Sequence, residues 1–287
     1  MKLFHILFCA LAMLAMAARA DAATLYAATA SGGPGRLYTI DPATGGAIQD
    51  IGPLNDVTGL NYPVTGLAFH PTTGVLYGST GNNPAATAGT FVRIDPATAL
   101  VTVIGPYNAG PTNSSGTPAT MTDLAFDAAG NLYGIGSIGG PQLYSINIAT
   151  GQATVIGSTG LTSTTGGGLA ISPSGDFYGT PTASRFGTYD STTGAYTNIT
   201  NPVKPGGGGA YAALAFDGNV LYGLNSAPGS PPPTFLVTID PATGAVTNVG
   251  QSINSIDAIA FQIPEPSTML MLISSIGMGI LRRLRRA

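Results

Sequence analysis

The chain has 287 residues, of which 44% are hydrophobic and only 8% are charged, whereas soluble domains carry roughly 25% charged residues. The apolar content is ample for a core, and 41 glycines and 22 prolines fall short of a collagen-like or disordered composition, so we expect a folded protein. Residues 23–262 carry four basic against eleven acidic residues, a net charge of −7, which argues against nucleic-acid binding.

Residues 1–22 have the pattern of a secretory signal peptide. Lys2 precedes an apolar run over residues 6–18, and small residues follow at Ala18, Ala20 and Ala22. The run is short for a membrane span, and a buried helix is the alternative. We expect export and cleavage by signal peptidase. The single cysteine, Cys9, lies in this segment, so the mature protein would have no disulfide, thiol nucleophile or thiolate metal site.

Three landmarks recur five times along the next part of the chain. The first is Leu-Ala-Phe or a close variant, whose starts are separated by 57, 45, 45 and 45 residues. The second is an aromatic Leu-Tyr-Gly-like element. The third is an Asp-Pro-Ala-Thr-Gly-like turn. In chain order, they occupy residues 67–69, 124–126, 169–171, 214–216 and 259–261; then 25–26, 76–78, 132–134, 177–179 and 221–223; and finally 41–45, 95–98, 147–151, 190–194 and 240–244.

Each unit predicts four short strands, because β-branched and aromatic residues alternate with Thr or Ser between turns rich in Gly and Pro. Units of this length with four strands are typical of propeller blades. The first unit lacks its Leu-Ala-Phe strand, while the last such strand, residues 259–261, has nothing after it. We therefore predict an all-β, single five-bladed β-propeller over residues 23–262, closed by pairing of its N- and C-terminal strands. Ala99 replaces a turn glycine and Asn147 a turn aspartate, so we expect those two turns to differ.

Residues 263–287 combine three features in order. Pro264-Glu265-Pro266 is followed by an apolar run over residues 269–281, which predicts a hydrophobic transmembrane helix, and then by Arg282, Arg283, Arg285 and Arg286. Arginines favour the cytoplasmic side, so the segment would lie with its N-terminal end outside. A plain membrane anchor is the alternative reading.

This C-terminal segment resembles the PEP-CTERM sorting signal of exported bacterial proteins. The resemblance implies recognition and cleavage near Pro264-Glu265-Pro266 by an exosortase-type membrane protease. The repeats resemble NHL and YVTN-like propeller repeats, which define a scaffold and carry no reaction of their own. Both resemblances imply a location in the cell envelope, membrane-anchored before processing, or outside the cell.

The long, dissimilar loops fall on one face of the predicted ring, where we expect binding. Asp123 and Asp257 precede inner strands at that face. Three interpretations remain open: solvated loop aspartates, calcium ligands together with backbone carbonyls, or a catalytic carboxylate pair. Tyr62, Tyr107 and Tyr211 lie in the long loops, where their rings suit stacking on a sugar or a protein partner.

The inventory of catalytic side chains is poor. His70 is the only histidine of residues 23–262, and it occupies the place of a turn aspartate, so we interpret it as a turn residue on the opposite face. Histidine-ligated zinc is excluded by the count, and we expect no cofactor apart from the calcium alternative. The leading hypothesis is a non-enzymatic exported surface or extracellular-matrix protein that binds a glycan or a surface protein. The alternative is a carbohydrate-active enzyme that uses Asp123 and Asp257, and the third hypothesis is a purely structural spacer.

Overall fold

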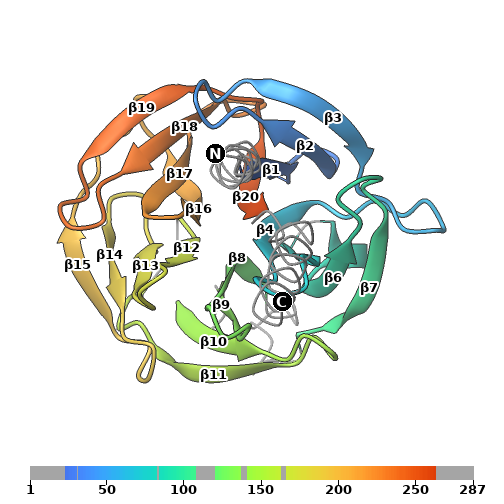
Figure 1. The fold of residues 1–287 in the computed structure, drawn as a ribbon, viewed down its shortest axis with the longest axis horizontal. Coiled ribbons are helices and arrows are strands. Elements are labelled where there is room, and N and C mark those ends of the chain that lie inside the picture. The colour runs from blue at the N-terminus through green and yellow to red at the C-terminus, as the bar shows by residue number, and fades with distance from the viewer. Residues whose placement is uncertain are drawn as a thin grey trace, which may run out of the picture. The chain divides into compact units, whose positions relative to one another are not determined.

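The computed structural model describes residues 23–30, 32–82, 84–107, 120–136, 141–162 and 166–262. Residues Leu25–Gln262 form one compact unit. Its strands make five four-stranded antiparallel sheets set around a ring as the blades of a propeller (Figure 1). The only helical element in the described ranges is a 3-10 turn, η1, at Ala85–Thr87. The predicted all-β five-bladed propeller is therefore confirmed, whereas the predicted signal peptide and C-terminal helix lie outside the described residues.

The strands of each blade run from the ring centre to its rim. Blade 1 contains β20 (Ile256–Gln262), β1 (Thr24–Thr29), β2 (Arg36–Ile40) and β3 (Ala47–Pro53). Blade 2 contains β4 (Val64–Phe69), β5 (Leu76–Thr80), β6 (Thr90–Ile94) and β7 (Val101–Pro106). Blade 3 contains β8 (Met121–Phe126), β9 (Leu132–Gly136), β10 (Gln142–Ile146) and β11 (Ala153–Ser158). Blade 4 contains β12 (Gly168–Ile171), β13 (Phe177–Thr180), β14 (Phe186–Tyr189) and β15 (Tyr196–Thr200). Blade 5 contains β16 (Ala210–Asp217), β17 (Val220–Ser226), β18 (Thr234–Ile239) and β19 (Val246–Gln251).

Blade 1 closes the ring, as the incomplete first and last repeats predicted. The last strand, β20, pairs with β1 and supplies the inner strand that the first repeat lacks. The Ala30 amide donates to the Ser255 carbonyl at 3.2 Å, and the Tyr26 hydroxyl donates to Gln262 Oε1 at 3.3 Å. This pairing removes the free inner edge that β1 would otherwise expose.

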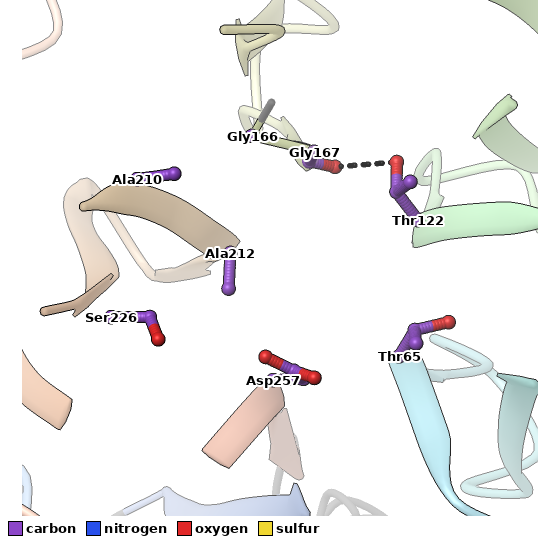
Figure 2. Close-up of a pocket in the computed structure, with 8 residues that line it drawn as sticks. All are labelled: Thr65, Thr122, Gly166, Gly167, Ala210, Ala212, Ser226 and Asp257. Atoms are coloured by element: carbon purple, nitrogen blue, oxygen red, sulfur yellow. Dashed lines mark hydrogen bonds between the residues drawn. The ribbon is translucent and has the colours of Figure 1, made fainter. Parts of the chain in front are cut away.

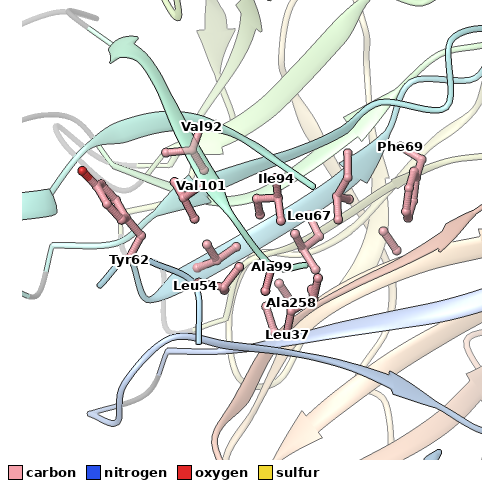
Figure 3. Packing of buried hydrophobic residues seen from close by; sticks show 14 residues of the cluster. Leu37, Leu54, Tyr62, Leu67, Phe69, Val92, Ile94, Ala99, Val101 and Ala258 are labelled. Carbon is pink, nitrogen blue, oxygen red and sulfur yellow. The ribbon is translucent and has the colours of Figure 1, made fainter. Parts of the chain in front are cut away.

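The apolar cores lie between neighbouring blades. Leu37 and Ala258 of blade 1 pack with Leu67 and Ile94 of blade 2 in the cluster drawn in Figure 3. Each repeated tyrosine contacts a phenylalanine of the following blade, at ring-centroid distances of 4.8–5.7 Å. The pairs are Tyr26–Phe69, Tyr77–Phe126, Tyr133–Phe177, Tyr178–Phe216 and Tyr222–Phe261. The predicted packing role of the repeated tyrosines is thus confirmed, and the last pair completes the circle.

The Asp-Pro-Ala-Thr-Gly-like turns all fold alike, contrary to our expectation for two of them. Asn147 Oδ1 accepts the amide of the second residue after it, Ala149, at 2.9 Å, as the turn aspartates do. Ala99 adopts the left-handed φ of 60° that glycine has in the other turns. The facing strand residue, Gly52, leaves room there, because a Cβ built on Gly52 lies 4.0 Å from that of Ala99.

Candidate functional site

Five equivalent residues ring one end of the central channel. Each lies two positions before the Leu-Ala-Phe landmark: Thr65, Thr122, Gly167, Ala212 and Asp257. The pairing register of three inner strands shifts by one residue at Thr65, Thr122 and Ala212. Such bulges redirect a side chain locally. The ring lies where the inner strands begin, which is the face that carries the long loops.

These five residues line a cavity of about 290 Å³. We call it the mouth cavity, and its described lining consists of Thr65, Thr122, Gly166, Gly167, Ala210, Ala212, Ser226 and Asp257 (Figure 2). Small residues form much of the wall, and Asp257 carries the only charge among these lining residues. The prediction that the long-loop face is hollowed by a ring of inner-strand residues therefore has a geometric counterpart, although no ligand identity follows from it.

The polar groups of the mouth cavity are partly committed to the protein. Thr65 Oγ1 donates to the Met121 carbonyl at 2.8 Å. Thr122 Oγ1 lies 3.1 Å from the Ile135 carbonyl oxygen and 3.2 Å from that of Gly167. A hydroxyl has one proton and two lone pairs, so these two threonines remain acceptors toward the cavity.

Asn225 fixes the loop that supplies one wall of the mouth cavity. Its side chain is fully buried, and its Nδ2 donates to the carbonyls of Gly208 and Ala210 at 3.1 and 3.2 Å. Its Oδ1 accepts the Gly206 amide at 3.1 Å. Sequence reasoning missed this residue. The available signal was its place directly after a Leu-Tyr-Gly strand, where Thr80 similarly accepts the Thr90 amide.

Asp123 does not reach the mouth cavity, which corrects its assignment as a partner of Asp257. It has no exposed surface, and its Oδ1 accepts the Leu124 amide at 2.9 Å. Its Oδ2 accepts the Leu169 amide of blade 4 at 2.9 Å and the Leu214 amide of blade 5 at 3.1 Å. Burial raises the pKa of Asp123 well above its usual value, against the opposing effect of these three amides. The carboxyl group thus joins the inner strands of three blades.

The three tyrosines proposed as stacking residues are buried, so their rings are not available to a ligand in this structure. Tyr107 and Tyr211 are at most 1% exposed and Tyr62 is 5% exposed. The Tyr211 hydroxyl donates to the Val203 carbonyl, and the Tyr62 hydroxyl donates to Asp56 Oδ2 at 3.0 Å. Desolvation raises the pKa of all three phenols. They anchor their loops, because a buried phenol packs its ring and satisfies its hydroxyl locally.

His70 is a turn residue, as predicted. Its Nδ1 accepts the amides of Thr72 and Thr73 at 3.2 and 3.3 Å, and its ring packs on Phe126 at 5.0 Å. In the described part of the chain, no group of three or more His, Cys, Asp or Glu side chains is placed to hold a metal ion. A calcium ion at the mouth cavity would therefore have Asp257 as its only carboxylate ligand among the described lining residues.

The calls on the two chain ends lie outside the described residues. They comprise Pro264, Glu265, Pro266, Arg282, Arg283, Arg285 and Arg286. Within the described ranges, no helix has the length and apolar character needed to cross a bilayer. The sorting signal and the membrane helix thus remain predictions from the sequence.

The fold and the mouth cavity define a five-bladed β-propeller with a small polar cavity at one end of its channel. The chain belongs to the family described as "Repeat of unknown function (DUF6923)", whose model matches residues 25–229. No curated protein matches the chain.

Two solved structures show similarity to the chain. TolB from Acinetobacter baumannii has 15% identity and a TM-score of 0.42, covering 80% of this chain and 52% of that one. The present chain thus spans about half the length of that TolB chain. A protein of unknown function from Bacteroides caccae has 12% identity and a TM-score of 0.45, covering 85% of this chain and 100% of that one.

Proposed function

We propose that this protein is a non-enzymatic, exported protein of the cell surface or extracellular matrix that binds a glycan or a surface protein at its long-loop face. The observation that carries the proposal is the mouth cavity, since it is concave, polar and framed by dissimilar loops on a rigid ring. Its address rests on the sequence of the chain ends: the signal-peptide pattern of residues 1–22 and the PEP-CTERM-like segment of residues 263–287.

The geometry gives the hydrolase alternative little support. Two carboxyl groups must flank the scissile bond in the usual glycosidase mechanism. Asp257 is the only acidic residue among the described cavity-lining residues, and Asp123 is enclosed by backbone amides. A second carboxylate from elsewhere would be needed for that reaction.

The test of binding combines two readouts on the full-length protein. An array of polysaccharides is probed for saturable binding with and without calcium, and the same wells are assayed for released sugar. We expect binding without release. Release that disappears in Asp257→Asn would replace this proposal by the enzyme alternative. Absence of binding to every glycan and surface protein tested would favour a structural spacer.

The address is tested separately by cell fractionation. We expect the protein in the envelope or the medium, and a chain in which residues 282–286 are deleted should be sorted wrongly because arginines retain that end on the cytoplasmic side. Recovery of the intact chain, with residues 1–22 still attached, from the cytoplasm would contradict export.

A further inference from the structure

The wall of the mouth cavity is richer in acceptors than in donors. The hydroxyl protons of Thr65 and Thr122 are directed to protein carbonyls, and the Gly167 amide donates to the Tyr211 carbonyl at 3.2 Å. What these groups offer to a ligand is therefore lone pairs on hydroxyl and carbonyl oxygens. A ligand that fits this wall must bring several donors of its own.

The wall also carries uncompensated negative charge. Asp257 contributes a carboxylate, and no Lys, Arg or His occurs among the described lining residues. Asp257 already interacts within the protein, but a carboxylate offers about four lone-pair sites, so a ligand group can be added. The surrounding residues 23–262 have a net charge of −7, which attracts cations toward the ring.

We propose that the mouth cavity binds an amino sugar whose nitrogen is a free ammonium, as one residue of a partly deacetylated polysaccharide. The ammonium contacts Asp257, and the sugar hydroxyls donate to Thr65, Thr122 and the carbonyls of the Gly166–Gly167 segment. The volume of about 290 Å³ is at the lower end for ligand pockets, so it holds a single sugar residue while the polymer leaves over the loops. This inference rests on the proposed glycan-binding function and specifies its ligand.

Two other cations fit the wall less well. Calcium takes six to eight oxygen ligands and usually several carboxylates, whereas this wall supplies one. A lysine side chain of a protein partner brings one ammonium on an apolar stem, so it leaves the hydroxyl and carbonyl acceptors of Thr65, Thr122 and Gly167 without partners. Both cations serve as comparison ligands in the test.

The experiment is isothermal calorimetry on the full-length protein at low salt. The probes are a glucosamine trimer, the N-acetylglucosamine trimer, a lysine-containing peptide and calcium chloride. We expect saturable binding of the amino trimer and at least about tenfold weaker binding of the acetylated trimer, because a charge-assisted hydrogen bond is worth about ten- to a hundredfold in affinity. Asp257→Asn should lose a similar factor.

Two further variants make the result specific. Ala212→Leu fills the mouth cavity while it retains Asp257, and it should weaken binding of the amino trimer. Asp217→Asn, at the opposite end of β16, is the matched control and should bind as the native chain does. Thermal melts check that each variant is folded, and the comparison of the two trimers on the native protein needs no variant.

The outcomes separate this inference from the proposed function. Glycan binding that is indifferent to the amino group, or unchanged in Asp257→Asn and Ala212→Leu, overturns the inference and leaves a glycan-binding protein. Binding of calcium alone or of the lysine peptide alone also overturns it. Absence of binding to neutral, acidic and amino glycans overturns the proposed glycan function as well.

Discussion

Asp123→Ala should destabilise the propeller far more than removal of an exposed aspartate. The substitution leaves the amides of Leu124, Leu169 and Leu214 without their acceptor in a site with no exposed surface. Each buried donor left unsatisfied costs about 1–3 kcal/mol, and loss of the buried carboxyl's own desolvation penalty offsets part of that sum. We expect a net loss of about 3–5 kcal/mol in the free energy of unfolding.

Urea denaturation of the full-length protein measures this loss. The matched control is Asp50→Ala, which removes an exposed ion pair with Arg36 whose Nη2 and Oδ2 atoms are 2.7 Å apart. Exposed pairs are worth about 0–1 kcal/mol, so this control should change little. If Asp123→Ala loses less than about 1 kcal/mol with an unchanged m value, the carboxyl group does not join the blades as we infer.

The pH dependence of Asp123→Asn tests the electrostatic part of the argument. Burial raises the folded-state pKa of Asp123 above its unfolded value, so the folded protein binds this proton more tightly. Its contribution to stability is therefore fully present below pH of about 4 and is lost as pH rises through the raised pKa. Relative to Asp123→Asn, the native protein should lose stability over that range. A relative gain with rising pH would show that the amides outweigh burial.

Three further substitutions test the outer turns. Gly157→Ala places a Cβ 1.9 Å from a facing turn carbonyl and should cost about 3 kcal/mol in unfolding free energy, whereas Gly33→Ala meets no atom within 4 Å and should be nearly neutral; equal effects would contradict the close approach. Ala99→Gly relieves a φ of 60° but removes a buried methyl group, so its stability should stay within about 1 kcal/mol of the native value, and a larger gain would mean that strain dominates. The Thr192 hydroxyl and nearby amides lower the pKa of Asp190 to about 2, so native stability should fall between about pH 4 and 2, and Asp190→Asn should lack this slope in acid titrations of the melting temperature.

The sequence predicted the scaffold because the repeat itself encodes blade packing. The tyrosine of each unit and the phenylalanine of the next recur at fixed spacing, and their rings meet in the structure. Even the irregular unit follows this rule. Ile171 stands where phenylalanine is expected, and Phe177, six residues later in the same blade, supplies the ring that contacts Tyr133.

The candidate site was predicted only in part, because orientation is decided by details that spacing does not reveal. Asp123 and Asp257 differ by one position relative to their Leu-Ala landmarks, and that single step separates an enclosed carboxyl from one that lines the mouth cavity. A one-residue shift in a strand exchanges the two sides of the sheet. Likewise, loop membership suggested exposure for Tyr62, Tyr107 and Tyr211, whereas their rings are buried.

The closure of blade 1 has a consequence for how the chain acquires its structure. Synthesis delivers β1, β2 and β3 first, but their inner neighbour β20 is the last strand to arrive. Asp123 similarly waits for amides 46 and 91 residues farther along. In contrast to an open array, in which a repeat contacts only its neighbours, this ring cannot be completed one repeat at a time. The nascent chain must therefore keep unpaired strand edges protected until almost the whole propeller has been made.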